Sequence, residues 1–196
     1  SNGNITVEAS SLADMLKVTH GTQVTDGIST AQEIVITGTS NDHKVTVNLE
    51  NKTVNITLDD VDLELSTGDD CPFSIDKGTV NLTLSGANNL FATGGNPGIR
   101  VANDSNFGIG TLTIKGGGSL VAKGATNGAG IGGGNGRSGG NITIEGGTVT
   151  AIGGGGGAGI GGGCSGSGGT IVIKGGTVTA IGGSGYVVND ATVGGA

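Results

Sequence analysis

The stretch NITIEGGTVTAIGG at residues 141–154 recurs almost unchanged as TIVIKGGTVTAIGG at 170–183, and this repetition decides the fold. The glycine-rich segment GGGAGIGGGCSGSGG separates the two copies. Weaker copies lie upstream, as GTLTIKGGGSLVAKG at 110–124, TVNLTLSGANNLFATGG at 79–95 and TVNITLDDVDLELSTG at 53–68. A period of about 30 residues indicates a repeat protein in which each unit stacks on the one before.

Apolar and polar residues alternate within each unit, which is the pattern of half-buried strands. We therefore predict an all-β chain folded as a right-handed parallel β-helix, a solenoid with three short strands in each coil. Like strands of successive coils then pair about 4.8 Å apart. A β-sandwich is the alternative fold. The residues that anchor the first strand of each coil are Ile56, Leu82, Leu112, Ile142 and Ile171.

The first residues do not follow the repeat. Ser11 to Asp14 resemble a helix start, and Met15 and Leu16 continue an apolar face that begins at Leu12. A solenoid needs a cover over its first open coil, because exposed strand edges and core invite aggregation. The sequence thus predicts a helical cap at the N-terminal end of the stack.

We place that cap at residues 1–33 and the coils of one β-helix domain at residues 34–196. No comparable helix follows the last coil, so we expect a partner or further chain to cover it. The partner could be a second copy of the chain, which would associate through the C-terminal end or through a coil face. The outward apolar strip expected on the second strand of the coils is Phe91, Val121, Ile152 and Ile181.

The composition argues against two classes of partner. The chain has 45 glycines among 196 residues, a net charge of −7 and only 2% aromatic residues. Nucleic-acid binding needs basic clusters and stacking platforms, so we expect no nucleic-acid partner. No apolar run approaches the length that spans a bilayer, so we expect no membrane insertion.

The repeat GAGIGGG…GGNITIEGGTVTA resembles β-helical repeats in secreted and cell-surface proteins of Gram-positive and gut bacteria. The stretch VNITLDDVDLEL…VNLTLSGANNLFATGG…GTLTIKGGGSL is similar to the β-helical carbohydrate-binding domains of such proteins, and together the two resemblances cover about residues 45–185. They imply a secreted or cell-surface, non-catalytic module that binds plant or microbial polysaccharide, with calcium as an accompanying ion.

The outer face of the third strand is the expected binding surface. Its glycines would expose bare backbone on which a flat sugar chain could lie, beside polar side chains from earlier coils. The alternative is that glycine only permits a tight corner there. The expected carbohydrate-binding residues are Ser74, Asp76, Arg100, Asn103, Asp104, Gly130 and Gly159.

Acidic turns provide the expected calcium ligands, Asp59 and Asp60 in one turn and Asp69 and Asp70 in another. Calcium prefers several carboxylate and carbonyl oxygens, and turns bring both together. Aspartate also favours turns for local reasons, which makes plain solvated turns the alternative.

Two further functions remain open. One is a purely structural stalk or adhesin repeat that mediates protein or surface contact. The other is a polysaccharide lyase-like enzyme. A lyase needs a base and cations that stabilise a developing carboxylate charge, but the two arginines, Arg100 and Arg137, occupy non-equivalent coil positions. A hydrolase needs two facing carboxylates, for which Asp76 and Asp104 are conceivable. We therefore expect no enzyme activity.

The two cysteines test the coil assignment. Cys71 and Cys164 fall three coils apart, which is roughly 14 Å along the axis at the strand spacing. A disulfide requires Cα atoms within about 7 Å. We therefore predict two free thiols.

Overall fold

The computed structural model describes residues 3–11, 15–20, 22–104, 108–188 and 191–193. Within these residues the chain is all-β and contains no helix. The strands are β1 (Ile5–Ala9), β2 (Met15–His20), β3 (Gln23–Ser29), β4 (Glu33–Ser40), β5 (Val45–Glu64), β6 (Phe73–Ser85), β7 (Ala87–Phe91), β8 (Ile99–Val101), β9 (Asn103–Asp104), β10 (Gly108–Gly116), β11 (Ser119–Lys123), β12 (Ile131–Gly132), β13 (Asn141–Ile144), β14 (Thr148–Ile152), β15 (Ile160–Gly161), β16 (Thr170–Ile173), β17 (Thr177–Ile181), β18 (Tyr186–Val188) and β19 (Ala191–Val193).

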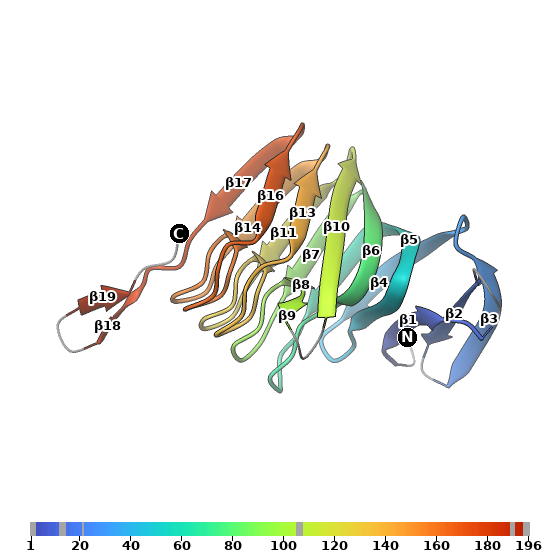
Figure 1. The fold of residues 1–196 in the computed structure, drawn as a ribbon, viewed down its shortest axis with the longest axis horizontal. Coiled ribbons are helices and arrows are strands. Elements are labelled where there is room, and N and C mark those ends of the chain that lie inside the picture. Colours follow the sequence, from blue (N-terminus) through green and yellow to red (C-terminus); the bar gives the residue numbers. More distant parts are fainter. Residues whose placement is uncertain (1–2, 12–14, 21, 105–107, 189–190, 194–196) are drawn as a thin grey trace.

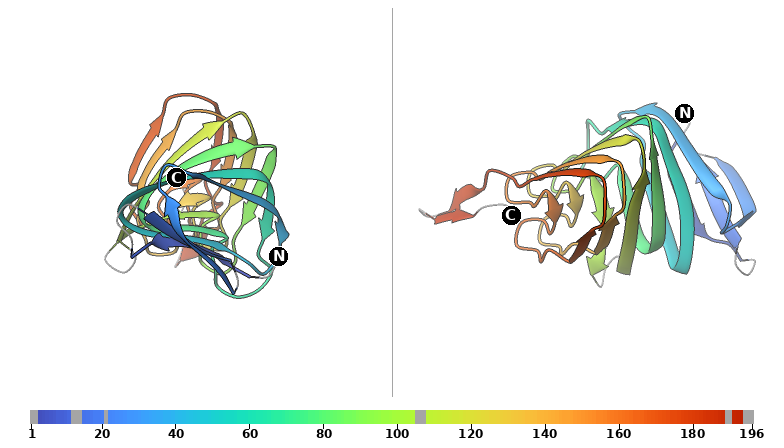
Figure 2. Two further views of the ribbon diagram at one scale, coloured as in Figure 1. Left: turned by 90° about the vertical axis from the view of Figure 1, so that its right-hand side faces the viewer. Right: turned by 90° about the horizontal axis from the view of Figure 1, so that it is seen from above.

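The strands wind around a common axis as a β-solenoid of about five turns (Figure 1, Figure 2). All neighbours within each face are parallel. The first face contains the start of β4, the middle of β5, and β6, β10, β13 and β16. The second contains the ends of β4 and β5, then β7, β11, β14 and β17. The third contains β1, the starts of β5 and β6, then β8, β12 and β15. The predicted parallel solenoid is confirmed, whereas its right-handed sense stays a prediction.

Aliphatic side chains from the three faces meet in one continuous core along the axis. Ile142 of β13 pairs with Leu112 of the preceding coil and with Ile171 of the following one, as the sequence predicts. Burial of one such side chain contributes about 1.5–3 kcal/mol. Because the next coil provides much of the cover, stability is shared between neighbouring coils.

The alignment of the upstream coils is wrong by two residues. Leu82 pairs with Ile114 rather than with Leu112, and on the second face Phe91 pairs with Lys123 rather than with Val121. The extra segment 102–109, which includes the antiparallel pair of β9 with the start of β10, lengthens the connection between these coils. A shift of two leaves every side chain on its original face, so the inward assignment survives.

The second face also places one polar side chain in the core. Asn88 is buried and lies in the row that Leu120 continues. Its Oδ1 accepts the N–H of Val61 at 3.0 Å, and its Nδ2 donates to the carbonyl oxygens of Ser85 at 2.9 Å and Ser119 at 3.0 Å. A buried polar group needs such partners. Asn88 therefore links three consecutive coils at the corner between the first and second faces.

The predicted N-terminal helical cap is wrong. Met15 and Leu16 lie in β2, which pairs antiparallel with β1 and β3, while residues 12–14 lie outside the described residues. The stretch MLKVTH alternates in burial around Leu16 and contains a β-branched Val18, which favours a strand. Val7 and Leu16 are fully buried in the core cluster, so a small sheet, β1–β3, covers the first coil.

Glycines in the later coils permit close contact between neighbouring backbones. Gly132 of β12 pairs with Gly161 of β15 in the following coil. A Cβ at Gly132 would lie 1.9 Å from the carbonyl oxygen of Gly161, and its φ of +134° disfavours any other residue. Gly117, at a turn between β10 and β11, differs because a Cβ there would meet nothing within 4 Å.

We expect Gly132→Ala to lower the free energy of unfolding by about 2–4 kcal/mol, because the methyl group forces two coils apart at a strained φ. Urea unfolding monitored by circular dichroism measures this loss. The matched variant Gly117→Ala should stay within about 0.5 kcal/mol of the parent. Equal effects of the two substitutions would contradict the close coil packing.

Candidate functional site

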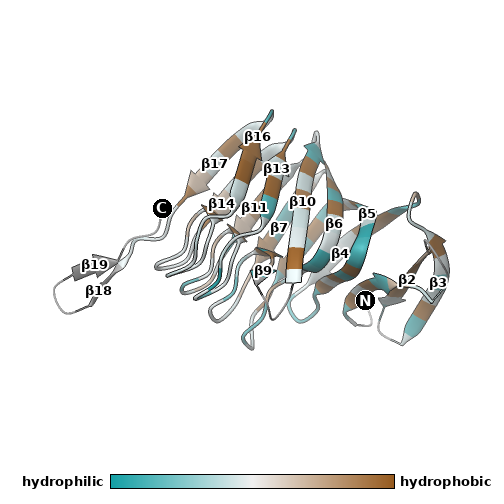
Figure 3. Ribbon diagram, viewed as in Figure 1, coloured by the Kyte–Doolittle hydropathy of each residue, from teal (hydrophilic) through white to brown (hydrophobic). Residues whose placement is uncertain are grey.

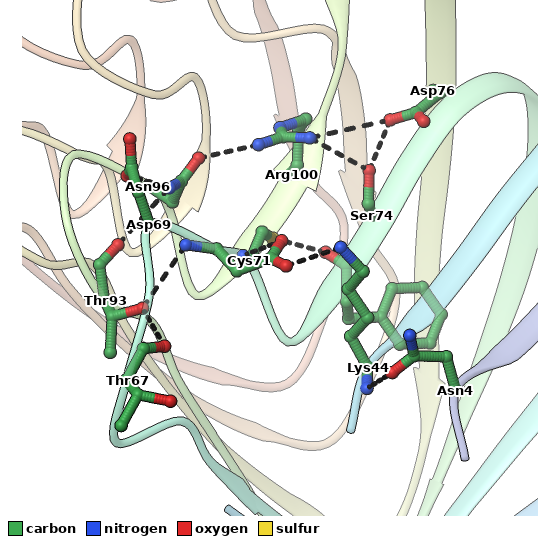
Figure 4. Close-up of polar contacts among 12 residues, drawn as sticks. Asn4, Lys44, Thr67, Asp69, Cys71, Ser74, Asp76, Thr93, Asn96 and Arg100 are labelled. Atoms are coloured by element: carbon green, nitrogen blue, oxygen red, sulfur yellow. Dashed lines mark hydrogen bonds and ion pairs between the residues drawn. The ribbon is translucent and has the colours of Figure 1, made fainter. Parts of the chain in front are cut away.

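The loops between the second and third faces of successive coils carry a chain of polar side chains (Figure 4). Asp69 Oδ1 accepts hydrogen bonds from the backbone N–H of Gly95 at 3.0 Å and from Asn96 Nδ2 at 2.5 Å. Asn96 Oδ1 in turn accepts from an Arg100 guanidinium nitrogen at 2.6 Å. These contacts join one coil to the next and fix the Asn96 amide in one orientation.

Arg100 extends this chain to the outer side of the third face. Its Nη1 lies 3.5 Å from Ser74 Oγ and 3.8 Å from Asp76 Oδ1. The Ser74 hydroxyl also donates to Asp76 (Figure 4). The Arg100 and Asp76 side chains are each less than one-fifth exposed, and Ser74 is buried. The structure therefore brings together three of the predicted binding residues, Ser74, Asp76 and Arg100.

A groove of about 420 Å³ opens beside Arg100. It spans loops of three successive coils, which corresponds to about 10 Å along the axis at the strand spacing. We call it the polar groove; it is lined by Asp69, Gly95, Asn96, Arg100, Gly134, Asn135 and Arg137. The N–H of Asn135 donates to the Gly95 carbonyl oxygen at 2.8 Å, which holds the last two loops together.

The sequence reasoning did not select Asn96, Asn135 or Arg137 as binding residues. Asn96 lies between β7 and β8, whereas Asn135 and Arg137 lie between β12 and β13, so these residues come from different corners of the coil and the repeat pattern gave no signal for their proximity. Asp69, which the sequence assigns to calcium, also lines the polar groove. Its two hydrogen bonds make it an acceptor that shapes the groove.

Gly130 and Gly159 do not form the exposed backbone shelf that the sequence predicts. Both are buried. A Cβ at Gly130 would lie 2.5 Å from the amide nitrogen of Ile152, and a Cβ at Gly159 would lie 2.5 Å from that of Ile181. Both glycines lie against neighbouring backbone, so the close packing of coils at these two positions requires glycine. The residue aligned with Ser74 and Arg100 in the next coil is Gly132.

Asn103 and Asp104 lie in β9 and do not line the polar groove. Asn103 is exposed, and its Nδ2 donates to the Gly139 carbonyl oxygen at 3.2 Å. The backbone of Asp104 pairs with Gly108, whereas its side chain lies outside the described part of the chain. The facing pair of Asp76 and Asp104 considered for a hydrolase is therefore not defined.

The four aspartates assigned to calcium occupy two different corners. Asp59 and Asp60 lie between the first and second faces, where Asp60 Oδ1 accepts the N–H of Ala87 at 2.8 Å. Asp69 and Asp70 lie between the second and third faces, and Asp70 Oδ2 pairs with Lys44 Nζ at 2.5 Å. No cluster of three or more acidic, histidine or cysteine side chains suited to a metal occurs among the described residues. Calcium binding stays a prediction.

The second-face strip also differs from the sequence prediction. Lys123 pairs with Phe91 on one side and with Ile152 on the other, in the place expected for Val121. Its Nζ lies 5.9 Å from the centre of the Phe91 ring, within the range of a cation–π contact. A cation therefore interrupts the apolar strip.

Both cysteines are free and buried, which confirms the prediction from coil spacing. The Cys71 thiol donates to the carbonyl oxygen of Phe73 at 2.9 Å, and the Cys71 N–H donates to Asp70 Oδ1 at 2.8 Å. Burial raises the pKa of Cys71 to about 11, because the thiolate would lose its hydration. Its sulfur is therefore suited to packing and not to nucleophilic chemistry.

Comparison with known proteins finds no matching family model, no matching characterised protein and no matching solved structure. The resemblance to β-helical carbohydrate-binding domains thus stays a prediction. The described residues include no helix long and apolar enough to cross a membrane. Any functional conclusion depends on the polar groove itself.

We expect the native protein to react slowly with a thiol reagent at pH 8, because a pKa of about 11 leaves on the order of 0.1% of Cys71 as thiolate. Absorbance after addition of an aromatic disulfide measures the rate. In denaturant both cysteines should react quickly, and the rate for Cys71 in the native protein should rise as the pH approaches 11. Rapid titration of both thiols of the native protein at pH 8 would contradict the buried Cys71 site.

Proposed function

We propose that this chain is a non-catalytic polysaccharide-binding module and that the polar groove is its binding surface. The observation that carries the proposal is the alignment of amide, carboxylate and guanidinium groups along loops of three successive coils. Sugar hydroxyls both donate and accept hydrogen bonds, and these groups offer both functions. The groove runs along the stack, so a linear chain of sugar units can contact several coils at once.

Pre-organisation supports binding at this place. Asn96 is held by Asp69 on one side and Arg100 on the other, and Arg100 is also close to Asp76. Side chains that are already fixed lose little conformational entropy when a ligand binds. Asn135 is exposed and Arg137 is half-buried, so both side chains are accessible to a ligand in the polar groove.

The same contacts support a binding role over catalysis. Asp69 accepts two hydrogen bonds, and Asp76 accepts from Ser74 beside the Arg100 guanidinium. A general acid or base must exchange its proton with the substrate at a suitable pKa. These carboxylates instead hold neighbouring side chains in position, which suits a rigid recognition surface.

The proposal includes two further properties, a location outside the cell and assistance by calcium. Location outside the cell follows from the resemblance to secreted and cell-surface repeats. Calcium assistance rests on the aspartates of the two corners, and the groove as described binds sugar through its own polar groups. Measurement of glycan binding with and without a chelator separates the calcium question from the groove.

A structural stalk is the second candidate function. The observation that favours it is the close repetition of the later coils, in which β13 pairs with β16 and β14 with β17 residue for residue. Such regular units are suited to a long stack. A stalk needs no groove, so it is distinguished by an absence of glycan binding.

We expect the chain to bind at least one member of a panel of soluble plant and microbial polysaccharides in affinity electrophoresis. Arg137→Ala, and Asn135→Ala to a smaller extent, should weaken that binding, with a loss of about tenfold or more for the arginine. The control Lys174→Ala removes an exposed cation on the first face, paired with Glu145 at 3.0 Å, and should leave affinity unchanged.

Two results would overturn the proposal. The first is an absence of binding across the panel in the presence of calcium. The second is binding that Arg137→Ala and Lys174→Ala reduce equally, since that would indicate a general charge effect instead of the groove. Circular dichroism of each variant establishes that the fold is retained.

A further inference from the structure

Asn135 and Gly136 form an exposed Asn-Gly pair at the polar groove. They lie in the loop GGNGRSGG at residues 133–140, between β12 and β13, which contains no apolar side chain. Figure 3 shows the loops of the later coils in pale colours, in contrast to the strongly apolar strand β16. Asn135 lines the groove, and both residues of the pair are exposed. Solvent therefore reaches the whole pair.

An asparagine followed by glycine can react with its own backbone. The backbone nitrogen of the glycine, once deprotonated by hydroxide, attacks the side-chain carbonyl carbon, and glycine has no Cβ to hinder the attack. A bond forms from this nitrogen to Cγ, the bond from Cγ to Nδ2 breaks, and ammonia leaves with a proton from water. Water then opens the five-membered imide to aspartate or isoaspartate. The reaction consumes only water and involves no change of oxidation state.

The loop around Asn135 is a tight turn with open space at its third residue. The Arg137 N–H donates to the Gly134 carbonyl oxygen at 2.9 Å, and Gly136 has a φ of +69°, as the third position of a type II turn requires. A Cβ at Gly136 would meet nothing within 4 Å. Its N–H donates to the Cys164 carbonyl oxygen of the next coil at 2.8 Å. The reaction therefore requires local opening of this one hydrogen bond at the surface.

A second Asn-Gly pair, Asn127 and Gly128, provides an internal comparison. Asn127 is half-buried and Gly128 is buried. The Gly128 N–H donates to the Ala125 carbonyl oxygen at 2.7 Å, and a Cβ at Gly128 would lie 2.1 Å from the carbonyl oxygen of Asn96 in the previous coil. Neighbouring backbone thus encloses the nitrogen that would have to attack. The two pairs share a sequence and differ in packing, which favours reaction at Asn135.

We propose that Asn135 is a site of spontaneous deamidation, through which the polar groove gains a carboxylate as the protein ages. The product has a negative charge at neutral pH in the groove that Arg137 also lines, where the parent has a neutral amide. Isoaspartate also lengthens the main chain next to the Asn135 N–H, which donates to the Gly95 carbonyl oxygen at 2.8 Å. The reaction thus changes both the charge and the loop geometry of the groove. This inference is independent of the polysaccharide proposal, because the reaction needs no ligand.

Incubation of the native protein at pH 9, followed by a brief tryptic digestion and mass spectrometry, tests the site. Trypsin cleaves after Lys123 and Arg137, so one peptide, 124–137, contains both Asn-Gly pairs and fragmentation compares them directly. Deamidation raises the mass by about 1 Da, because a hydroxyl group replaces an amino group. We expect Asn135 to gain this mass about tenfold or more faster than Asn127, because local opening at the surface costs less free energy.

The free peptide 124–137 is the reference for this comparison. Without the packing of the coils, its two Asn-Gly pairs should react at similar rates, and both should react faster than Asn135 in the native protein. The native rate at Asn135 should rise with pH, because the attacking nitrogen must lose its proton. Asn135→Gln should abolish the mass gain in this peptide, since glutamine would have to close a larger ring. The matched control Asn127→Gln should leave the mass gain unchanged.

Three results would overturn the proposal. The first is an unmodified Asn135 in native protein after an incubation that modifies the free peptide. The second is modification of Asn127 in native protein at the same rate as Asn135 or faster. The third is an equal mass gain of peptide 124–137 in Asn135→Gln and in the parent. Circular dichroism spectra of both variants that match the parent show that the fold is retained.

Discussion

Every coil of this solenoid depends on a neighbouring coil for its backbone hydrogen bonds and for the cover over its apolar side chains. Like strands must therefore remain in register from coil to coil at about 4.8 Å. Glycine satisfies this constraint where neighbouring backbones approach closely, as at Gly132 against Gly161, and Asn88 satisfies it through hydrogen bonds to three coils. The same dependence explains why the exposed Ile173 differs from the buried Ile144.

The stacking constraint also builds the candidate site. Loops from three coils are held at a fixed spacing, so Asp69, Asn96 and Arg137 line one groove although they are far apart in sequence. The Asp69–Asn96–Arg100 hydrogen bonds then fix the orientation of the polar groups. The proposed polysaccharide binding thus depends on the rigidity of the whole stack, because no single loop forms the groove.

The period of the repeat and the alternation within strands were sufficient to predict a parallel solenoid, its inward residues and its free cysteines. Pairing of Leu82 with Ile114 was missed because the segment 102–109 adds residues that similarity between strands does not reveal. The helix expected at Met15 and Leu16 is a strand, since pairing with β1 and β3 outweighs a weak local signal. Ser74, Asp76 and Arg100 were found together because their strands are adjacent, whereas Arg137 lies in a loop whose position depends on turn geometry.

Deletion of one whole coil tests the central claim most directly. Removal of residues 141–169 joins Gly140 to Thr170, which occupies the same register position as Asn141. We expect this shortened chain to keep a strand-type circular dichroism spectrum and a cooperative thermal transition, because Ile171 and Ile173 can then pack on Leu112 and Ile114. Removal of residues 141–154 alone breaks the register and should abolish that transition. Loss of the fold in both deletions, or retention of it in both, would contradict a stack built from interchangeable coils.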